Sequence, residues 1–227
     1  MVNNKKIISI AIDGPAAAGK STIAKLVSKQ LNYTYIDTGA MYRAVTLYCL
    51  KHGINCQNEP EVIAVLPKIS IRLKPEHVVM LNNKDVSFDI RTPEVNQNVS
   101  YIAAIKEVRL ALVEQQRQMA SLDSVVMDGR DIGTYVLPNA NVKIFMIASV
   151  ETRAVRRYEE NLSKGINLSL EDVIEEVRKR DYIDSHRDFA PLKMANDAVI
   201  IDTSFMSIVE VVARVLEIIG EKIKCND

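Results

Sequence analysis

Apolar residues along the chain alternate between short runs typical of buried strands and longer stretches with the period of a helix. The first run, 7–12, is β-branched and apolar, as in a strand that is buried on both faces. From Lys20 onward the apolar positions follow a helical stripe through Ile23, Val27 and Leu31. This alternation predicts an α/β fold with a parallel sheet and right-handed crossovers.

The alternation continues through most of the chain. We expect four further strands, at 33–36, 124–127, 142–148 and 198–201, which makes a five-stranded parallel sheet. We expect the flanking helices at 39–51, at 102–119, from Ser169 to about Arg187, and after Ser207, where Ser207-x-x-Glu210 is the pattern of a capping box.

The stretch 67–88 breaks this rhythm. Residues 69–73 alternate with period two, and the apolar runs 78–81 and 86–88 flank the turn-forming residues 82–85. The pattern predicts a small three-stranded antiparallel sheet inserted into the α/β core.

The balance of charge limits what the chain can bind. Its 227 residues carry 29 basic and 29 acidic side chains, so the formal net charge is zero. A neutral chain has no general electrostatic attraction for nucleic acid or for an anionic membrane, and we expect neither as a partner. Any bound anion must therefore be held by local groups of Lys, Arg or backbone N–H.

Other composition features exclude several classes of protein. No apolar stretch approaches the roughly 20 residues that span a bilayer. We also expect no signal peptide, because the apolar run that follows residues 1–6 does not lead to a cleavage site of small residues. Three cysteines (Cys49, Cys56, Cys225) and three histidines (His52, His77, His186) are too few and too scattered for a disulfide framework or a catalytic metal cage. We expect a cytoplasmic location.

A phosphate-binding loop follows the first strand and fits G-x-x-x-x-G-K-[ST]. Its glycines allow the backbone to wrap around a phosphate, and the next helix presents its positive end to the same anion. Lys20 can reach the β- and γ-phosphates, and the Ser21 hydroxyl can ligate Mg²⁺. The expected ATP-binding residues are Gly14, Pro15, Ala16, Ala17, Ala18, Gly19, Lys20, Ser21 and Thr22.

Arginines and carboxylates follow other predicted strands. Residues 37–43 place a carboxylate and a hydroxyl at a strand end and then Arg43 on a helix, and 128–134 place Arg130 between two aspartates. Ligands of open α/β sheets bind at the carboxyl ends of the strands. A solvated surface arginine and a salt-bridged turn are the alternative interpretations of these two segments.

A third group lies on the predicted helix after Ser169. Arg180, Asp184 and Arg187 have the spacing i, i+4, i+7, so a helix places them on one face, although an ordinary surface ion pair has the same spacing. Residues 153–157 carry three more arginines. So many cations fit two phosphorylated substrates, which favours a phosphoryl-transfer enzyme that works by positioning and charge neutralisation.

In these motifs and their order, the chain resembles the bacterial cytidylate kinases, the (d)CMP kinases of the nucleoside monophosphate kinase superfamily. The resemblance rests on IDGPAAAGKST (12–22), DTGAMYR (37–43), DIRTPEV (89–95), DGRDIGT (128–134) and RDYIDSHRDFAPL (180–192). These motifs are spread over nearly the whole chain, in the order that the family has them.

The resemblance implies transfer of a phosphoryl group from ATP to CMP or dCMP with Mg²⁺, giving ADP and CDP or dCDP, by a monomer. It implies a P-loop kinase core (1–36 and 101–227), a short lid (about 153–170) and an NMP-binding lobe (37–100) that contains the antiparallel sheet (67–88). Its implied catalytic residues are Lys20, Arg43, Arg130, Arg157 and Arg187. Its implied CMP-binding residues are Thr38, Arg43, Ser100, Arg109, Arg130, Asp131, Arg180, Asp184 and Arg187.

The implied base contacts are chemically consistent with cytosine. Asp131 can accept a hydrogen bond from the N4 amino group, and Arg109 and Ser100 can donate to N3 and O2. Uracil presents a carbonyl in place of that amino group and would leave polar groups unpaired.

Two other readings fit parts of the sequence. A related small kinase acting on UMP, shikimate or dephospho-coenzyme A has a similar phosphate loop, but the inserted sheet and 128–134 favour CMP. A P-loop switch protein needs an N-K-x-D motif after a strand, whereas the compressed Asn83-Lys84-Asp85 lies in a predicted hairpin.

Overall fold

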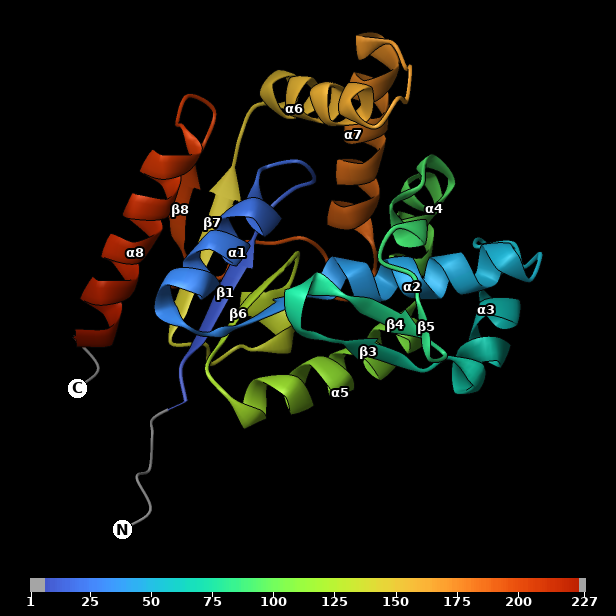
Figure 1. Cartoon of the computed structure of the whole chain (residues 1–227), viewed down its shortest axis with the longest axis horizontal. Helices are drawn as coiled ribbons and strands as arrows, with labels where there is room; N and C mark the ends of the chain where they lie inside the picture. The colour runs from blue at the N-terminus through green and yellow to red at the C-terminus, as the bar shows by residue number, and fades with distance from the viewer. Residues whose placement is uncertain (1–6, 225–227) are drawn as a thin grey trace.

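A five-stranded parallel sheet forms the centre of the protein (Figure 1). The computed structural model describes residues 7–224, so 1–6 and Cys225 lie outside the described residues. The strands, in the order β2-β6-β1-β7-β8, are β2 (Thr34–Asp37), β6 (Val125–Gly129), β1 (Ser9–Asp13), β7 (Val142–Ile147) and β8 (Val199–Asp202). All neighbouring pairs are parallel. The predicted fold class is confirmed.

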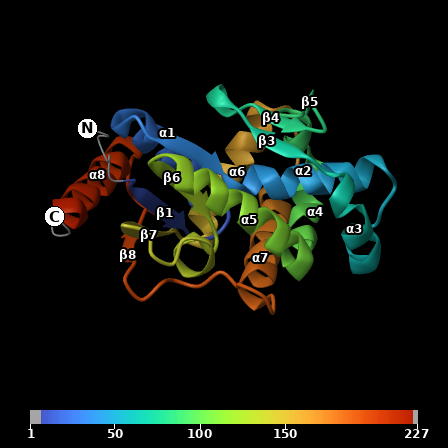
Figure 2. The ribbon, with the colours of Figure 1, turned by 90° about the horizontal axis from the view of Figure 1, so that it is seen from below.

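Helices cover both faces of this sheet because successive residues of a strand point to opposite sides. On one face Ile10 and Ile12 of β1 lie in the apolar cluster of α1 (Lys20–Leu31) and α8 (Ile208–Lys224). On the other face Ala11 packs with α5 (Lys106–Leu122). Figure 2 shows α1 and α8 together on the side away from α5.

The predicted helix start at Ser207 is confirmed by its capping hydrogen bonds. The Glu210 N–H donates to the Ser207 hydroxyl at 3.3 Å, and the Ser207 N–H donates to the Glu210 carboxylate at 2.8 Å. Ser169 makes the same reciprocal pair with Asp172 at the start of α7 (Leu170–His186).

A second group of elements, which we call the α2–α4 lobe, packs around its own apolar cluster. It comprises α2 (Thr38–Lys51), α3 (Glu59–Val65), α4 (Pro93–Ala104) and the antiparallel strands β3 (Ile71–Leu73), β4 (Val79–Leu81) and β5 (Lys84–Asp85). The remaining helices are α6 (Val150–Ser163) and the single turns η1 (Leu66–Lys68), η2 (Pro75–His77), η3 (Asp89–Arg91) and η4 (Ile132–Val136, a π-helical turn). Helices α6 and α7 stand beyond the carboxyl ends of the central strands (Figure 1).

The third antiparallel strand is two residues earlier than expected. The prediction placed it at 86–88 and the turn at 82–85, but Lys84 and Asp85 pair with β4. Asn82 and Asn83 both have positive φ (47° and 65°), so these two residues alone make the turn.

The prediction of one long helix at 102–119 is wrong. Ile105 has an extended conformation (φ −69°, ψ 121°), which ends α4 at Ala104 and starts α5 at Lys106. The break frees the Ala103 carbonyl from the helical ladder. That carbonyl instead accepts hydrogen bonds from the side chains of Arg109 (3.1 Å) and Arg187 (3.5 Å).

Across residues 7–224, every helix is too short or too polar to span a bilayer.

Candidate active site

A cavity of about 1030 Å³ opens at the carboxyl ends of the central strands, bordered by α2 and α4 of the α2–α4 lobe and by α6 and α7. This is at the upper end of the ordinary volume of small-molecule sites. All the residues predicted to bind substrate line this cavity except Gly14 and Pro15. They are Ala16, Ala17, Ala18, Gly19, Lys20, Ser21, Thr22, Thr38, Arg43, Ser100, Arg109, Arg130, Asp131, Arg157, Arg180, Asp184 and Arg187.

The phosphate loop connects β1 to α1 in a conformation that its glycines permit. Gly14 has φ 148°, and a Cβ there would lie 2.0 Å from the Met146 carbonyl oxygen of β7. Gly19 has φ 88° at the N-cap of α1. The loop is therefore pressed against the neighbouring strand while the positive end of α1 faces the cavity.

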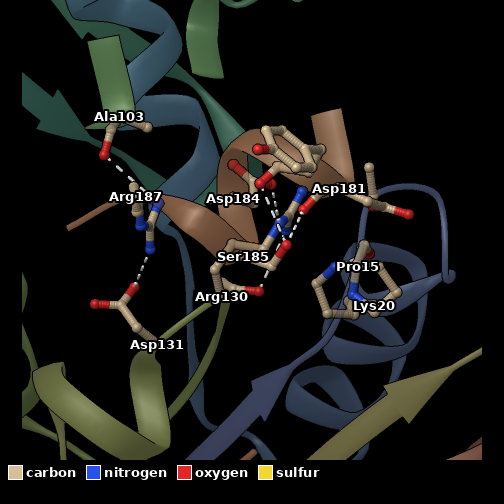
Figure 3. A network of polar contacts seen from close by, with 12 residues as sticks. Pro15, Lys20, Ala103, Arg130, Asp131, Asp181, Asp184, Ser185 and Arg187 are labelled. Carbon is tan, nitrogen blue, oxygen red and sulfur yellow. Dashed lines mark hydrogen bonds and ion pairs between the residues drawn. The ribbon is translucent and has the colours of Figure 1, made fainter. Parts of the chain in front are cut away.

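Lys20 and Ser21 lie where this loop meets β6. The Lys20 ammonium donates to the Pro15 carbonyl at 2.7 Å (Figure 3). The Ser21 hydroxyl donates to one oxygen of Asp128 at 2.8 Å, and the Tyr35 hydroxyl donates to the other at 2.7 Å. A hydroxyl and a carboxylate therefore lie together at the phosphate end of the cavity.

Another part of the cavity is built around Asp131. Its carboxylate pairs with Arg109 at 2.5 Å and with Arg187 at 3.4 Å. Figure 3 shows Arg187 between this carboxylate and the Ala103 carbonyl. Ser100 of α4 is buried and also lines the cavity. The structure thus brings Arg109, Asp131 and Ser100 to one cavity as donors and acceptors, the arrangement expected for reading a base edge.

The remaining predicted cations also line the cavity. Arg130 donates from Nε to Asp184 at 2.8 Å, and the Thr38 hydroxyl donates to the Asp128 carbonyl at 2.7 Å. Arg43 donates to the side-chain oxygen of Asn96 on α4. Within residues 7–224, the buried Nε of Arg180 has no hydrogen-bond partner.

Several of these cations are buried without full compensation by carboxylates, although for Arg130 burial is outweighed by nearby carboxylates, Asp184 first among them, which raise its pKa. Burial, followed by the charge of nearby arginines, lowers the pKa of Lys20, of Arg43 and of Arg187, and the same causes lower the pKa of Arg180 to about 10. A lowered pKa means that the charged form lacks compensation in its surroundings. Bound phosphates would supply the missing negative charge.

The three arginines of α6 differ in position. Arg153 is buried and donates to the carbonyls of Ala148 (2.9 Å) and Ala16 (3.1 Å), and it pairs with Asp181 at 2.7 Å. Arg156 and Arg157 line the cavity, and Arg157 pairs with Glu160 at 3.1 Å.

Some residues in or near the cavity were not predicted to bind substrate. Asp128 was noted in the sequence as one of the two aspartates that flank Arg130, but its hydrogen bond from the Ser21 hydroxyl was not expected. Arg91 lines the cavity and pairs with Asp37 at 3.3 Å, and both lie in motifs that carry the resemblance. Tyr35 gave no sequence signal because its role depends on the pairing of β2 with β6.

The parallel sheet, the loop after β1 and the arginine-lined cavity define a P-loop kinase. The sequence model described as Cytidylate kinase matches residues 10–221. A cytidylate kinase of Bacillus cytotoxicus is 52% identical over 222 residues, which cover 96% of this chain and 99% of its own length. A cytidylate kinase of Leuconostoc mesenteroides is 51% identical over 217 residues, covering 94% and 97%. The chain belongs to the cytidylate kinase family.

Solved structures agree at the level of the fold. A gluconokinase from Sinorhizobium meliloti superposes with a TM-score of 0.50 at 12% identity, covering 94% of this chain and 92% of its own. At this identity the likeness shows a shared fold and nothing about substrate.

Proposed function

We propose that this chain transfers the γ-phosphoryl group of ATP to CMP or dCMP, giving ADP and CDP or dCDP. The observation that carries the proposal is the cavity itself, in which under-compensated cations lie between a phosphate loop and the buried Asp131. One end is suited to a triphosphate and the other to a polar base. Family membership supports the same reaction.

In this proposal the loop 14–22 holds the ATP phosphates. Lys20, Arg43, Arg130 and Arg187 surround the travelling phosphoryl group, and Arg157 of α6 reaches it when the lid segment closes. These groups gain most when charge develops in the transition state, so they raise the rate without covalent chemistry. Thr38, Arg180 and Asp184 hold the sugar and phosphate of CMP.

Selection of cytosine is assigned to Asp131, Arg109 and Ser100. Asp131 accepts from the N4 amino group while Arg109 and Ser100 donate to N3 and O2. Arg109 and Asp131 are nearly inaccessible to solvent, with side-chain exposures of 1% and 5%. A base that leaves such groups unpaired loses much of its affinity.

The family implies that ATP is used with a divalent metal ion, and we infer Mg²⁺. Oxygen donors suit this hard cation. The Ser21 hydroxyl and the Asp128 carboxylate, 2.8 Å apart, are the residues that would hold it, directly or through water. A bound metal ion would neutralise charge on the β- and γ-phosphates.

The remaining assignments are also proposals. We infer a monomer in the cytoplasm, with residues 37–100 as the NMP-binding lobe and 153–170 as the lid. ATP, ADP and the cytidine nucleotides are its partners, and nucleic acid and membranes are not.

A panel of acceptors in one coupled assay of ADP release tests the proposal. CMP, dCMP, UMP, AMP, shikimate and dephospho-coenzyme A are compared at equal concentration with ATP and Mg²⁺. We expect CMP and dCMP to give the highest kcat/KM. Turnover of CMP no faster than that of AMP would contradict the proposal. Arg214→Ala, a substitution on the exposed face of α8, is the control variant and should give the same order of acceptors as the wild-type protein.

A further inference from the structure

Asp13, the last residue of β1, holds the backbone of a segment that lies more than a hundred residues away in the sequence. Its two carboxylate oxygens accept the N–H groups of Ile132 (2.8 Å) and Gly133 (2.7 Å). Asp13 itself is 4% exposed and directly precedes Gly14 of the phosphate loop. This carboxylate therefore joins the ATP side of the cavity to the first turn of η4.

The two N–H groups that Asp13 holds directly follow Asp131. From the other side, the Asp131 carboxylate is held by Arg109 and Arg187. The position of Asp131 is thus fixed by its side chain at one end and by the backbone of the next two residues at the other. Without the backbone anchor, Arg109 and Arg187 would still pair with the Asp131 carboxylate. The carboxylate would then no longer be held at a fixed position relative to the cavity walls.

Only an ionised carboxylate can make both bonds well. An amide of the same shape offers one acceptor oxygen and an NH₂ group, which would face one of the two N–H donors. Gly133 also lies tightly against this site, since a Cβ there would approach Asp13 Oδ2 at 3.4 Å and Lys143 Cδ at 3.1 Å. A side chain at position 133 would therefore press first on Lys143 and would also touch the Asp13 carboxylate.

We propose that Asp13 is a positioning residue that sets the selectivity for cytosine by fixing the backbone that follows Asp131. The inference rests on the proposed function, in which Asp131 reads the base. Asp13 lies outside the cavity lining, so it acts through the loop alone. A misplaced Asp131 would bind cytosine less well and would exclude uracil less strictly.

A rival role for Asp13 is to balance the charge of Lys20. The Lys20 ammonium favours the ionised form of the Asp13 carboxylate, because the two opposite charges attract each other. The two roles predict different kinetics. A charge effect on Lys20 would act on ATP, whereas a loop effect would act on CMP.

The test compares wild-type protein with Asp13→Asn at about pH 8, where the Asp13 carboxylate is ionised, using CMP and UMP as acceptors. We expect the KM for CMP to rise about 10-fold, the KM for ATP to stay within about 2-fold, and the ratio of kcat/KM for CMP over UMP to fall about 10-fold. A folded variant with an unchanged KM for CMP and an unchanged ratio overturns the proposal. A raised KM for ATP with an unchanged KM for CMP also overturns it, in favour of the Lys20 role.

A matched control separates positioning from stability. Ser124 is buried and its hydroxyl accepts the N–H of Ile8 at 3.0 Å, near the opposite end of β1. Ser124→Ala removes a comparable hydrogen bond, and we expect it to lower the melting temperature without changing the ratio for CMP over UMP. A comparable fall of that ratio in Ser124→Ala would show a general effect of instability and would overturn the proposal.

A second variant keeps the test available if Asp13→Asn does not fold. Gly133→Ala places a Cβ 3.1 Å from Lys143 Cδ and 3.4 Å from Asp13 Oδ2, so it displaces the loop at a residue whose N–H Asp13 holds and whose φ is not positive. We expect the same direction of change in the ratio, and an unchanged ratio in this variant overturns the proposal. A wild-type enzyme with no preference for CMP would instead overturn the proposed function, so the two failures are distinguishable.

Discussion

Arg187 lies just after the last turn of α7, nearly buried, and shares Asp131 with Arg109. Burial and the charge of Arg109 lower its pKa, so its positive charge is poorly compensated without substrate. In Arg187→Ala we expect kcat to fall about 10²- to 10³-fold, because the proposed function puts this guanidinium beside the transferred group, where it stabilises the transition state most.

Steady-state kinetics with saturating ATP and CMP measure the effect of Arg187→Ala. The control is Arg214→Ala, which removes an arginine paired with Glu217 on the exposed surface of α8. If Arg187→Ala keeps the wild-type kcat, Arg187 does not act at the transfer step.

The buried Asp13 carboxyl group should make the free energy of unfolding depend on pH. Burial raises its pKa to about 7, from an ordinary value of 3.8. Because the folded state holds the proton more tightly than the unfolded state, the contribution of Asp13 to stability is complete below about pH 4 and is lost as the pH rises to about 7. The amide side chain in Asp13→Asn does not titrate, so that variant lacks this loss.

We therefore expect the stability of Asp13→Asn, relative to wild type, to improve by up to about 1 kcal/mol per pH unit between about pH 5 and pH 7, and to level off above about pH 8. Urea unfolding of both proteins at matched pH values measures the difference. A difference in unfolding free energy that is constant over this range contradicts the raised pKa.

Among single residues, sequence reasoning found those with recognisable chemistry. Lys20, Arg43 and Arg130 stand in motifs and line the cavity as expected. Tyr35 and Asp13 could not be found in this way, because their partners, Asp128 of β6 and the first residues of η4, are brought near them only by the tertiary fold.

At the scale of elements, α6 is attached to the phosphate loop through Arg153. Its guanidinium holds the Ala16 carbonyl, and because the peptide unit is planar and trans, the N–H of Ala17 points the opposite way. Ala17 has φ 58°, which is unfavourable for a residue with a side chain. Arg153 therefore stabilises the loop conformation that turns this N–H away from the guanidinium.

For Arg153→Met we expect the KM for ATP to rise about 10-fold and the unfolding free energy to fall by about 2–4 kcal/mol, because Asp181 and the Ala16 carbonyl lose their buried partner. Kinetics and urea unfolding measure both effects. Arg178→Met is the matched control, since Arg178 links α7 to Glu151 of α6 in an exposed pair at 3.8 Å. An unchanged KM for ATP in Arg153→Met would contradict the role.

The elements themselves were predictable where local signals were strong. Capping pairs located the starts of α7 and α8, and apolar runs located the central strands. The break at Ile105 was not predictable, since the residues around it keep an acceptable helical pattern. It is favoured by the tertiary contacts of Arg109 and Arg187 with the freed Ala103 carbonyl.

At the scale of the whole molecule, two packing units border one charged cavity. The apolar cluster of the α2–α4 lobe is distinct from the cluster under α1 and α8, and it meets the cluster on the α5 face of the sheet at Leu73 and Met119. Arg43 reaches the cavity from the lobe, while Arg130 and Arg180 reach it from β6 and α7. Like charges on opposite walls repel one another when no anion lies between them.

Binding of both nucleotides should therefore draw the walls together and exclude water from the phosphates. With a bisubstrate analogue that joins adenosine to cytidine through phosphates, we expect the radius of gyration to fall below that of the free protein, which is roughly 17 Å for a chain of this length. Small-angle scattering measures the change, and cytidine, which carries no phosphate, should leave the profile unaltered. Superimposable profiles with and without the analogue would mean that the cavity is already closed and that mutual repulsion of its cations does not hold it open.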